Sequence, residues 1–185
     1  MFSEGAPVTA CAFTYDTVQS PVLANGIGIY GGTGNRAEYD VIQDTVSASA
    51  GIAISTRFNP VAFAGTTSVQ HDTLTRTGGL EPNWPANLGA LWIFADQIDI
   101  AAPIVVHDLS IADSTWQGLL VSFQRNIDGL SLDGVTIAGA GTYGMEINAT
   151  GAATFSNTHV SGAASGGLSL APTFTLTRGP GDTGF

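Results

Sequence analysis

Six residues in the middle of the sequence have side chains suited to binding a sugar: Arg57, Arg76, Glu81, Trp84, Trp92 and Asp96. Indoles can stack on the C–H face of a pyranose ring, while guanidinium and carboxylate groups can bond to its hydroxyls. We therefore predict the two tryptophans as stacking platforms, the two arginines as hydrogen-bond donors and the two acids as acceptors. The alternative is that both indoles only pack loops onto the fold.

These residues lie where a repeat in the sequence is longest. The phrase GIGIYG at residue 26 returns as GIAI at 51, GALWI at 89, GLLVSF at 118, GMEI at 144 and GLSL at 167. The interval from Gly51 to Gly89 is the longest, and its extra residues fall at 57–65 and 76–89. The next interval is extended through 96–103. Because insertions of a solenoid emerge on one face, we expect the six side chains to gather there.

The repeat itself predicts an all-β fold. Short Val-, Ile- and Thr-rich stretches alternate with Gly, Asn and Asp at a period of about 25 residues, and helical periodicity is absent. We predict one domain, 1–185, forming a right-handed parallel β-helix of six to seven coils, with 178–185 as an exit tail. A second ladder should supply turn residues that bond their own following amides: Asp16, Asp40, Asp72, Asp108, Asp133 and Asn157.

Composition excludes several partners. The net charge is −10 and the only cations besides histidine are five scattered arginines, so we expect neither nucleic acid nor a membrane as partner. There is no apolar run long enough to span a membrane, and residues 1–8 do not resemble a signal peptide. His71-Asp72 and His107-Asp108 could meet at a metal, but the repeat alone explains their recurrence. We predict no cofactor.

Beyond composition, the phrases resemble a known family. ANGIGIYGGTGNRAEYDVIQDT, AGIAISTRFNPVAFAGTT, TRTGGLEPNW, LGALWIFAD and GAGTYGMEINATGAATFSNTHVSGAASGGL are similar to the C-terminal part of the catalytic β-helix of glycoside hydrolase family 87, the mycodextranases and α-1,3-glucanases. The resemblance covers essentially the whole chain. It implies a secreted, extracellular parent protein that hydrolyses α-1,3-glucan by an inverting mechanism.

The catalytic phrases of that family are missing from this sequence. The resemblance implies three aspartates, one in an Asp-Gly-Ile phrase and two in a Gly-Asp-Asp-Ala-Leu-Ala phrase, and the chain contains neither. We therefore predict no catalytic residue here and expect an N-terminally truncated fragment that binds glucan. Two alternatives stay open: a non-catalytic carbohydrate-binding or adhesive solenoid, and a hydrolase that uses Glu81 with Asp96.

Overall fold

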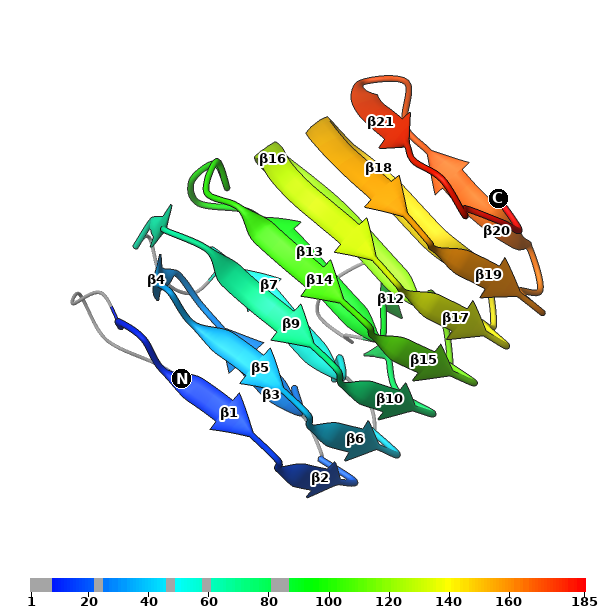
Figure 1. Cartoon of the computed structure of the whole chain (residues 1–185), viewed down its shortest axis with the longest axis horizontal. Coiled ribbons are helices and arrows are strands. Elements are labelled where there is room, and N and C mark those ends of the chain that lie inside the picture. Colours follow the sequence, from blue (N-terminus) through cyan, green and yellow to red (C-terminus); the bar gives the residue numbers. More distant parts are fainter. Residues whose placement is uncertain (1–7, 22–24, 46–48, 58–60, 81–86) are drawn as a thin grey trace.

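In the computed structural model, which describes residues 8–21, 25–45, 49–57, 61–80 and 87–185, every regular element is a β-strand. The strands form successive coils that lie side by side from the N-terminal to the C-terminal end (Figure 1). No helix in the described residues is long and apolar enough to cross a membrane. Each full coil has three faces, which we number along the chain, starting with the face that contains the glycine-led phrase.

The first face begins at each glycine-led phrase. It consists of β3 (Ile27–Ile29), β7 (Ile52–Ser55), β13 (Leu91–Ala95), the N-terminal parts of β16 (Leu119–Asp133) and β18 (Tyr143–Ser156), and β20 (Gly166–Leu170). The second face consists of β1 (Ala12–Thr14), β5 (Arg36–Glu38), β9 (Thr67–Gln70), β14 (Ile104–His107), the C-terminal parts of β16 and β18, and β21 (Phe174–Arg178).

The third face closes each coil. It consists of β2 (Thr17–Gln19), β6 (Val41–Gln43), β10 (Thr73–Thr75), β15 (Ser110–Ala112), β17 (Thr136–Ala138) and β19 (His159–Ser161). Two small pairs stand outside the faces: β4 (Gly32–Thr33) pairs in parallel with β8 (Phe63–Ala64), and β11 (Gly79–Leu80) pairs antiparallel with β12 (Asn87–Leu88). All pairings within the three faces are parallel, which confirms the predicted all-β parallel β-helix.

The aliphatic residues of the glycine-led phrases form two continuous columns inside the coils. Their pairing runs Ile27, Ile52, Leu91, Leu119, Met145, Leu168 in one column and Ile29, Ile54, Ile93, Val121, Ile147, Leu170 in the other. Nearly all are fully buried, and full burial of one such side chain contributes about 1.5–3 kcal/mol. These side chains therefore line the interior except in the last coil, where Leu168 is only partly buried and Leu170 is 41% exposed.

The glycines that open the repeated phrases are required because the third and first faces pack closely together. A Cβ on Gly144 would lie 2.2 Å from Val160 Cγ1 and 3.0 Å from the Gly167 carbonyl oxygen, and one on Gly118 would lie 2.4 Å from Ile137 Cγ2. Neither glycine has a positive φ. These positions therefore need glycine because an inward side chain of the third face fills the space.

We expect Gly144→Ala to lower the free energy of unfolding by about 1–3 kcal/mol, because the added methyl group overpacks the corner beside Val160. Urea unfolding of Gly144→Ala, Val160→Ala and the double variant measures this effect. Since Val160→Ala removes the clashing methyl group, the double variant should lose less stability than the two single losses together. Additive losses would show that the contact with Val160 is not the cause.

The aspartate ladder stabilises the turns differently from our expectation. Asp40 Oδ1 accepts a hydrogen bond from the Asp16 amide at 2.8 Å, and Asp72 Oδ1 accepts one from the Asp40 amide at 2.7 Å. Each carboxylate thus bonds the backbone of the preceding coil and not its own following amide. Asp108 lies one position earlier in its turn, with φ of 50°, and Asp133 is the last residue of β16. The residues of the predicted ladder therefore do not all occupy the same position in successive coils.

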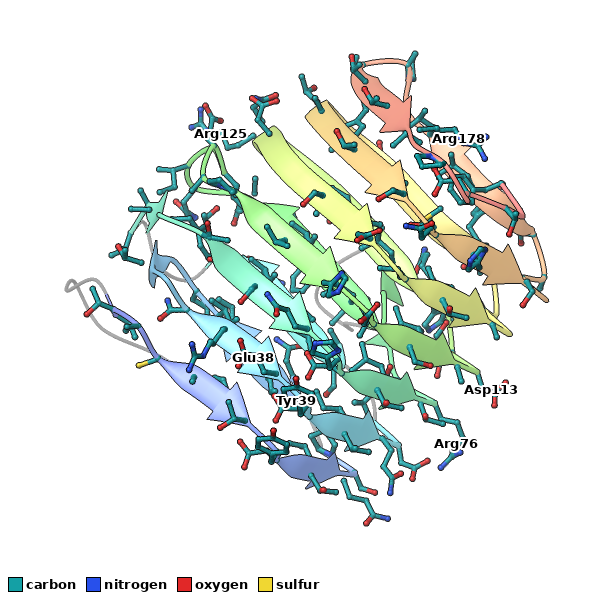
Figure 2. The ribbon with its side chains drawn as sticks, in the orientation of Figure 1. Glu38, Tyr39, Arg76, Asp113, Arg125 and Arg178 are labelled. Carbon is teal, nitrogen blue, oxygen red and sulfur yellow. The ribbon has the colours of Figure 1, made fainter. Side chains whose placement is uncertain are left out.

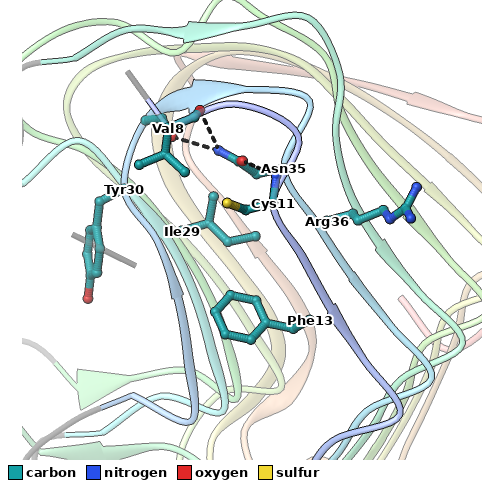
Figure 3. Close-up of a pocket in the computed structure, with 8 residues that line it drawn as sticks. Val8, Cys11, Phe13, Ile29, Tyr30, Asn35 and Arg36 are labelled. Atoms are coloured by element: carbon teal, nitrogen blue, oxygen red, sulfur yellow. Dashed lines mark hydrogen bonds between the residues drawn. The ribbon is translucent and has the colours of Figure 1, made fainter. Parts of the chain in front are cut away.

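The two ends of the described rod differ. Residues 179–185, within the predicted exit tail, pack back on the last coil: the Val160 amide donates to the Thr183 carbonyl at 3.0 Å, and Phe185 packs edge-on against Phe155. At the other end, a pocket opens between the first coils, lined by Val8, Cys11, Phe13, Ile29, Tyr30, Gly31, Asn35 and Arg36 (Figure 3). Its amide side chain, Asn35, already bonds Cys11 and Gly31, so we do not assign a ligand to it.

Candidate functional site

The coils that carry the long insertions contribute neighbouring strands, β7 and β13, to the first face. Alternation along each strand turns every second side chain outward, which places Trp92 beside Ala53 and Leu120 in one outward row and Phe94 beside Ser122 in the next. At one edge of this face lie the turns that follow β7 and β13. At the other edge lies the connection from β10 to β13, which includes β11 and β12.

Trp92 is buried on the outer side of the first face. Its side chain is 2% exposed and belongs to an apolar cluster outside the central core, made of Ala50, Ala53, Leu88, Trp92, Phe94 and Leu120. The indole stacks on Phe94 at a centroid distance of 5.0 Å, and its Nε1 donates to Ser122 Oγ at 3.1 Å. With both its faces and its N–H occupied or covered, Trp92 has the packing role of our alternative interpretation, and it offers no open stacking platform.

Two of the predicted residues, Arg57 and Asp96, lie in neighbouring turns at one edge of the first face. Thr56 joins their coils, because its hydroxyl accepts from the Asp96 amide at 3.0 Å and donates to the Ile98 carbonyl at 3.1 Å. Both side chains are half-buried. Arg57 and Asp96, which are 39 residues apart in the sequence, therefore lie in equivalent turns of neighbouring coils.

Arg76 lies at the opposite edge, in the turn after β10. Its guanidinium makes a two-pronged ion pair with Asp44 of the preceding coil, with Nε at 2.6 Å from Oδ1 and Nη2 at 3.1 Å from Oδ2. The hydrogen bond from Arg76 lowers the pKa of Asp44. Arg76 is thus separated from Arg57 by the width of the first face and is engaged in structure. Glu81 and Trp84 lie outside the described residues.

One outward carboxylate of this face, Glu146, escaped our attention in the sequence. Gln117 Nε2 donates to Glu146 Oε2 at 2.7 Å. Glu146 pairs in register with Leu120, which pairs with Trp92, so Glu146 lies two coils beyond Trp92. The Oε1 atom of Gln117 is buried and has no hydrogen-bond partner among the described residues. The exposed amide of Asn148 lies two residues along the same strand. The alternation of GMEIN around Met145 and Ile147 would have predicted both outward positions.

A second group of polar side chains lies at the corner between the second and third faces. His107 Nε2 is 3.2 Å from Asp108 Oδ2, and His71 Nδ1 is 3.4 Å from the same oxygen. In the described part of the chain, no group of three or more His, Cys, Asp or Glu side chains is placed to hold a metal ion. Of the two His-Asp pairs, His71, His107 and Asp108 contact one another directly, whereas Asp72 is buried and accepts from the Asp40 amide.

Comparison with known proteins gives a match in structure. No protein-family model matches the chain, and no curated protein matches it in sequence. The catalytic unit of the thermostable GH87 α-1,3-glucanase from Streptomyces thermodiastaticus strain HF3-3 matches with a TM-score of 0.91 and 35% identity, over 100% of this chain and 37% of that one. The chain therefore spans little more than a third of the length of this structure.

Two further structures support the fold alone. The Agl-KA catalytic domain matches with a TM-score of 0.85 and 21% identity, over 92% of this chain and 32% of that one. The catalytic domain of a GH87 α-1,3-glucanase variant in complex with tetrasaccharides matches with a TM-score of 0.76 and 20% identity, over 94% and 41%. In fold and in sequence, the chain is similar over its whole length to part of the catalytic β-helix of glycoside hydrolase family 87, as its phrases predicted.

Proposed function

We propose that this chain is the glucan-binding part of a glycoside hydrolase that acts on α-1,3-glucan in the manner of a mycodextranase or α-1,3-glucanase. The single observation that carries the proposal is the 35% identity to the Streptomyces enzyme across all 185 residues. The match covers the whole length of the chain, including the strands of the first face, along which we propose that a polysaccharide lies. An insoluble polymer also requires the parent protein to act outside the cell.

The polar end of the first face supplies the proposed contacts. Glu146 would accept a hydrogen bond from a sugar hydroxyl, while Gln117 fixes its carboxylate and Asn148 offers an exposed amide nearby. Arg57 and Asp96 add a donor and an acceptor at the edge of the same face. Carboxylate and amide groups at fixed positions are the usual means of orienting a sugar in a binding groove.

We further propose that the chain alone binds glucan without cleaving it. Inverting hydrolysis needs one carboxylic acid to protonate the leaving oxygen and one carboxylate to activate water, about 6.5–9.5 Å apart. The Asp-Asp and Asp-Gly-Ile phrases that the family resemblance implies for this role do not occur in the 185 residues. The carboxylates for hydrolysis would then come from residues outside this chain.

Sedimentation with insoluble α-1,3-glucan tests the proposal, together with a reducing-sugar assay of the supernatant. We expect binding without sugar release, and about tenfold weaker binding for Glu146→Ala, since a hydrogen bond to a charged group contributes about 1.5–3 kcal/mol. Asp113→Asn, which changes an exposed acid on the third-face corner, is the matched control and should bind normally. Steady sugar release by the purified chain would contradict the absence of catalytic residues.

A further inference from the structure

An aromatic stack runs along the corner where the second face meets the third. Tyr15 and Tyr39 stack at a centroid distance of 4.9 Å with planes 4° apart, and Tyr39 stacks on His71 at 4.7 Å with planes 13° apart. The rings come from three successive coils, in the turns after β1, β5 and β9. Figure 2 shows Tyr39 at this corner, beside Glu38.

Polar side chains continue the line beyond His71. His107 packs edge-on against His71 at 5.6 Å, and its Nδ1 lies 3.4 Å from Asp133 Oδ2. Asp133 in turn accepts hydrogen bonds from Ser156 and Asn157, which lower its pKa. We call Tyr15, Tyr39, His71, His107, Asp108 and Asp133 the corner stripe. It crosses five coils and presents rings at one end and fixed imidazole and carboxylate groups at the other.

The tyrosines are both exposed and held in an unfavourable backbone conformation. Tyr15 is 76% exposed and Tyr39 45%, with φ of 59° and 62°. Bulky residues rarely adopt a left-handed conformation, which costs about 1–2 kcal/mol outside Gly, Asn and Asp. Later coils use Gly134 and Asn157 at the same position of the turn, with φ of 69° and 48°. The turn itself therefore does not require an aromatic ring, and strain of this kind gathers at functional positions.

From this geometry we propose that the corner stripe is a second polysaccharide-binding surface, separate from the first face, which takes a neutral glucan strand running along the rod. Tyr39 is 45% exposed although Tyr15 and His71 stack on its two faces, so the edges of the stacked rings are open to sugars that lie along the corner. The exposed ring edges, the imidazoles and the carboxylates then meet successive sugars at the coil spacing of about 4.8 Å.

Charge favours a neutral glycan over a charged one. The stripe and its neighbour Glu38 hold three carboxylates, and the nearby Arg36 lies 3.5 Å from Glu38. The whole chain carries a net charge of −10. An acidic polysaccharide would be repelled, whereas the hydroxyls of a neutral glucan can donate to Glu38, Asp108 and Asp133.

The test uses the double variant Tyr15→Asn, Tyr39→Asn in the full chain. Asparagine is favoured at positive φ, so the variant removes the rings while the turns are kept, and thermal unfolding should confirm an intact fold. In sedimentation with insoluble α-1,3-glucan we expect binding about tenfold weaker than that of the unchanged chain. The conservative pair Tyr15→Phe, Tyr39→Phe keeps the stack and should recover most of the affinity.

Two further variants distinguish binding at the corner stripe from binding at the first face. Glu146→Ala alone should weaken binding by its own factor, and combining it with the double tyrosine variant should multiply the two losses, because the surfaces are independent. Binding by the folded Tyr15→Asn, Tyr39→Asn protein equal to that of the unchanged chain would overturn the inference, whatever Glu146→Ala does. Loss in the tyrosine variant with none in Glu146→Ala would support the corner stripe and count against the first-face site.

Discussion

Replacing Asp72 by asparagine is expected to stabilise the protein at pH 8 by up to about 4 kcal/mol and to remove a fall in stability between pH 4 and pH 7. Asp72 is 1% exposed, and its burial raises the pKa to about 7 from 3.8, with the nearby Asp40 carboxylate adding to the shift. Its Oδ2 atom is buried and has no hydrogen-bond partner among the described residues. Each unit of pKa difference corresponds to about 1.4 kcal/mol.

The sign follows from proton binding. Between the unfolded pKa near 3.8 and the folded pKa near 7, the folded state holds a proton on Asp72 that the unfolded state has lost, so stability falls as pH rises through this window. Above pH 7 the folded state must bury the charge. Asparagine avoids this cost and still offers Oδ1 to the Asp40 amide. Burial also raises the pKa of Asp40, so a smaller slope should remain in the variant.

Urea unfolding at pH 4.5, 5.5, 6.5 and 8 measures the difference between the two proteins. Asp113→Asn is the control because it makes the same chemical change at an exposed turn, and it should follow the unchanged chain at every pH. Equal slopes for Asp72→Asn and the unchanged chain would mean that the buried carboxyl is not the titrating group.

The fold could be predicted from the sequence because one period controls two columns of side chains. A fixed interval between glycine-led phrases brings Ile27, Ile52 and Leu91 to the same place in successive coils, and parallel pairing then stacks them without further information. The reason for the glycines could not be predicted in this way. The contact of Gly144 with Val160 depends on how far the third face approaches the first, which the repeat does not specify.

The expected gathering of the candidate side chains was predicted only in part, because the insertions enter at both edges of the first face. Arg57 and Asp96 fall in equivalent turns of neighbouring coils, whereas Arg76 belongs to the turn on the other side of the face and pairs with Asp44. The bonds of Asp40 and Asp72 to preceding coils were missed for a similar reason. A turn motif predicts only bonds to the neighbouring residues in the sequence. In the stacked coils, the carboxylate instead accepts from an amide of the preceding coil.

Replacing Trp92 by alanine is expected to lower the free energy of unfolding by about 3–5 kcal/mol, the range for deleting a large buried aromatic side chain. The loss would open a cavity on the outer side of the first face, where the indole contacts Phe94 and belongs to the cluster with Leu88 and Leu120. Trp92→Phe keeps most of the apolar volume and loses the bond to Ser122, so it should cost much less, about 1 kcal/mol from the hydrogen bond.

Glucan binding separates this packing role from the predicted stacking platform. For Trp92→Phe, urea unfolding and sedimentation with insoluble α-1,3-glucan should give a small stability loss and unchanged affinity, because a 2% exposed indole has no face to offer a sugar. For Trp92→Ala, any loss of binding should follow the fraction of unfolded protein and recover on cooling below its melting transition. A folded Trp92→Ala protein that no longer binds would instead restore Trp92 as a platform, since removing a buried support alone leaves Glu146 and Asn148 in place two coils away.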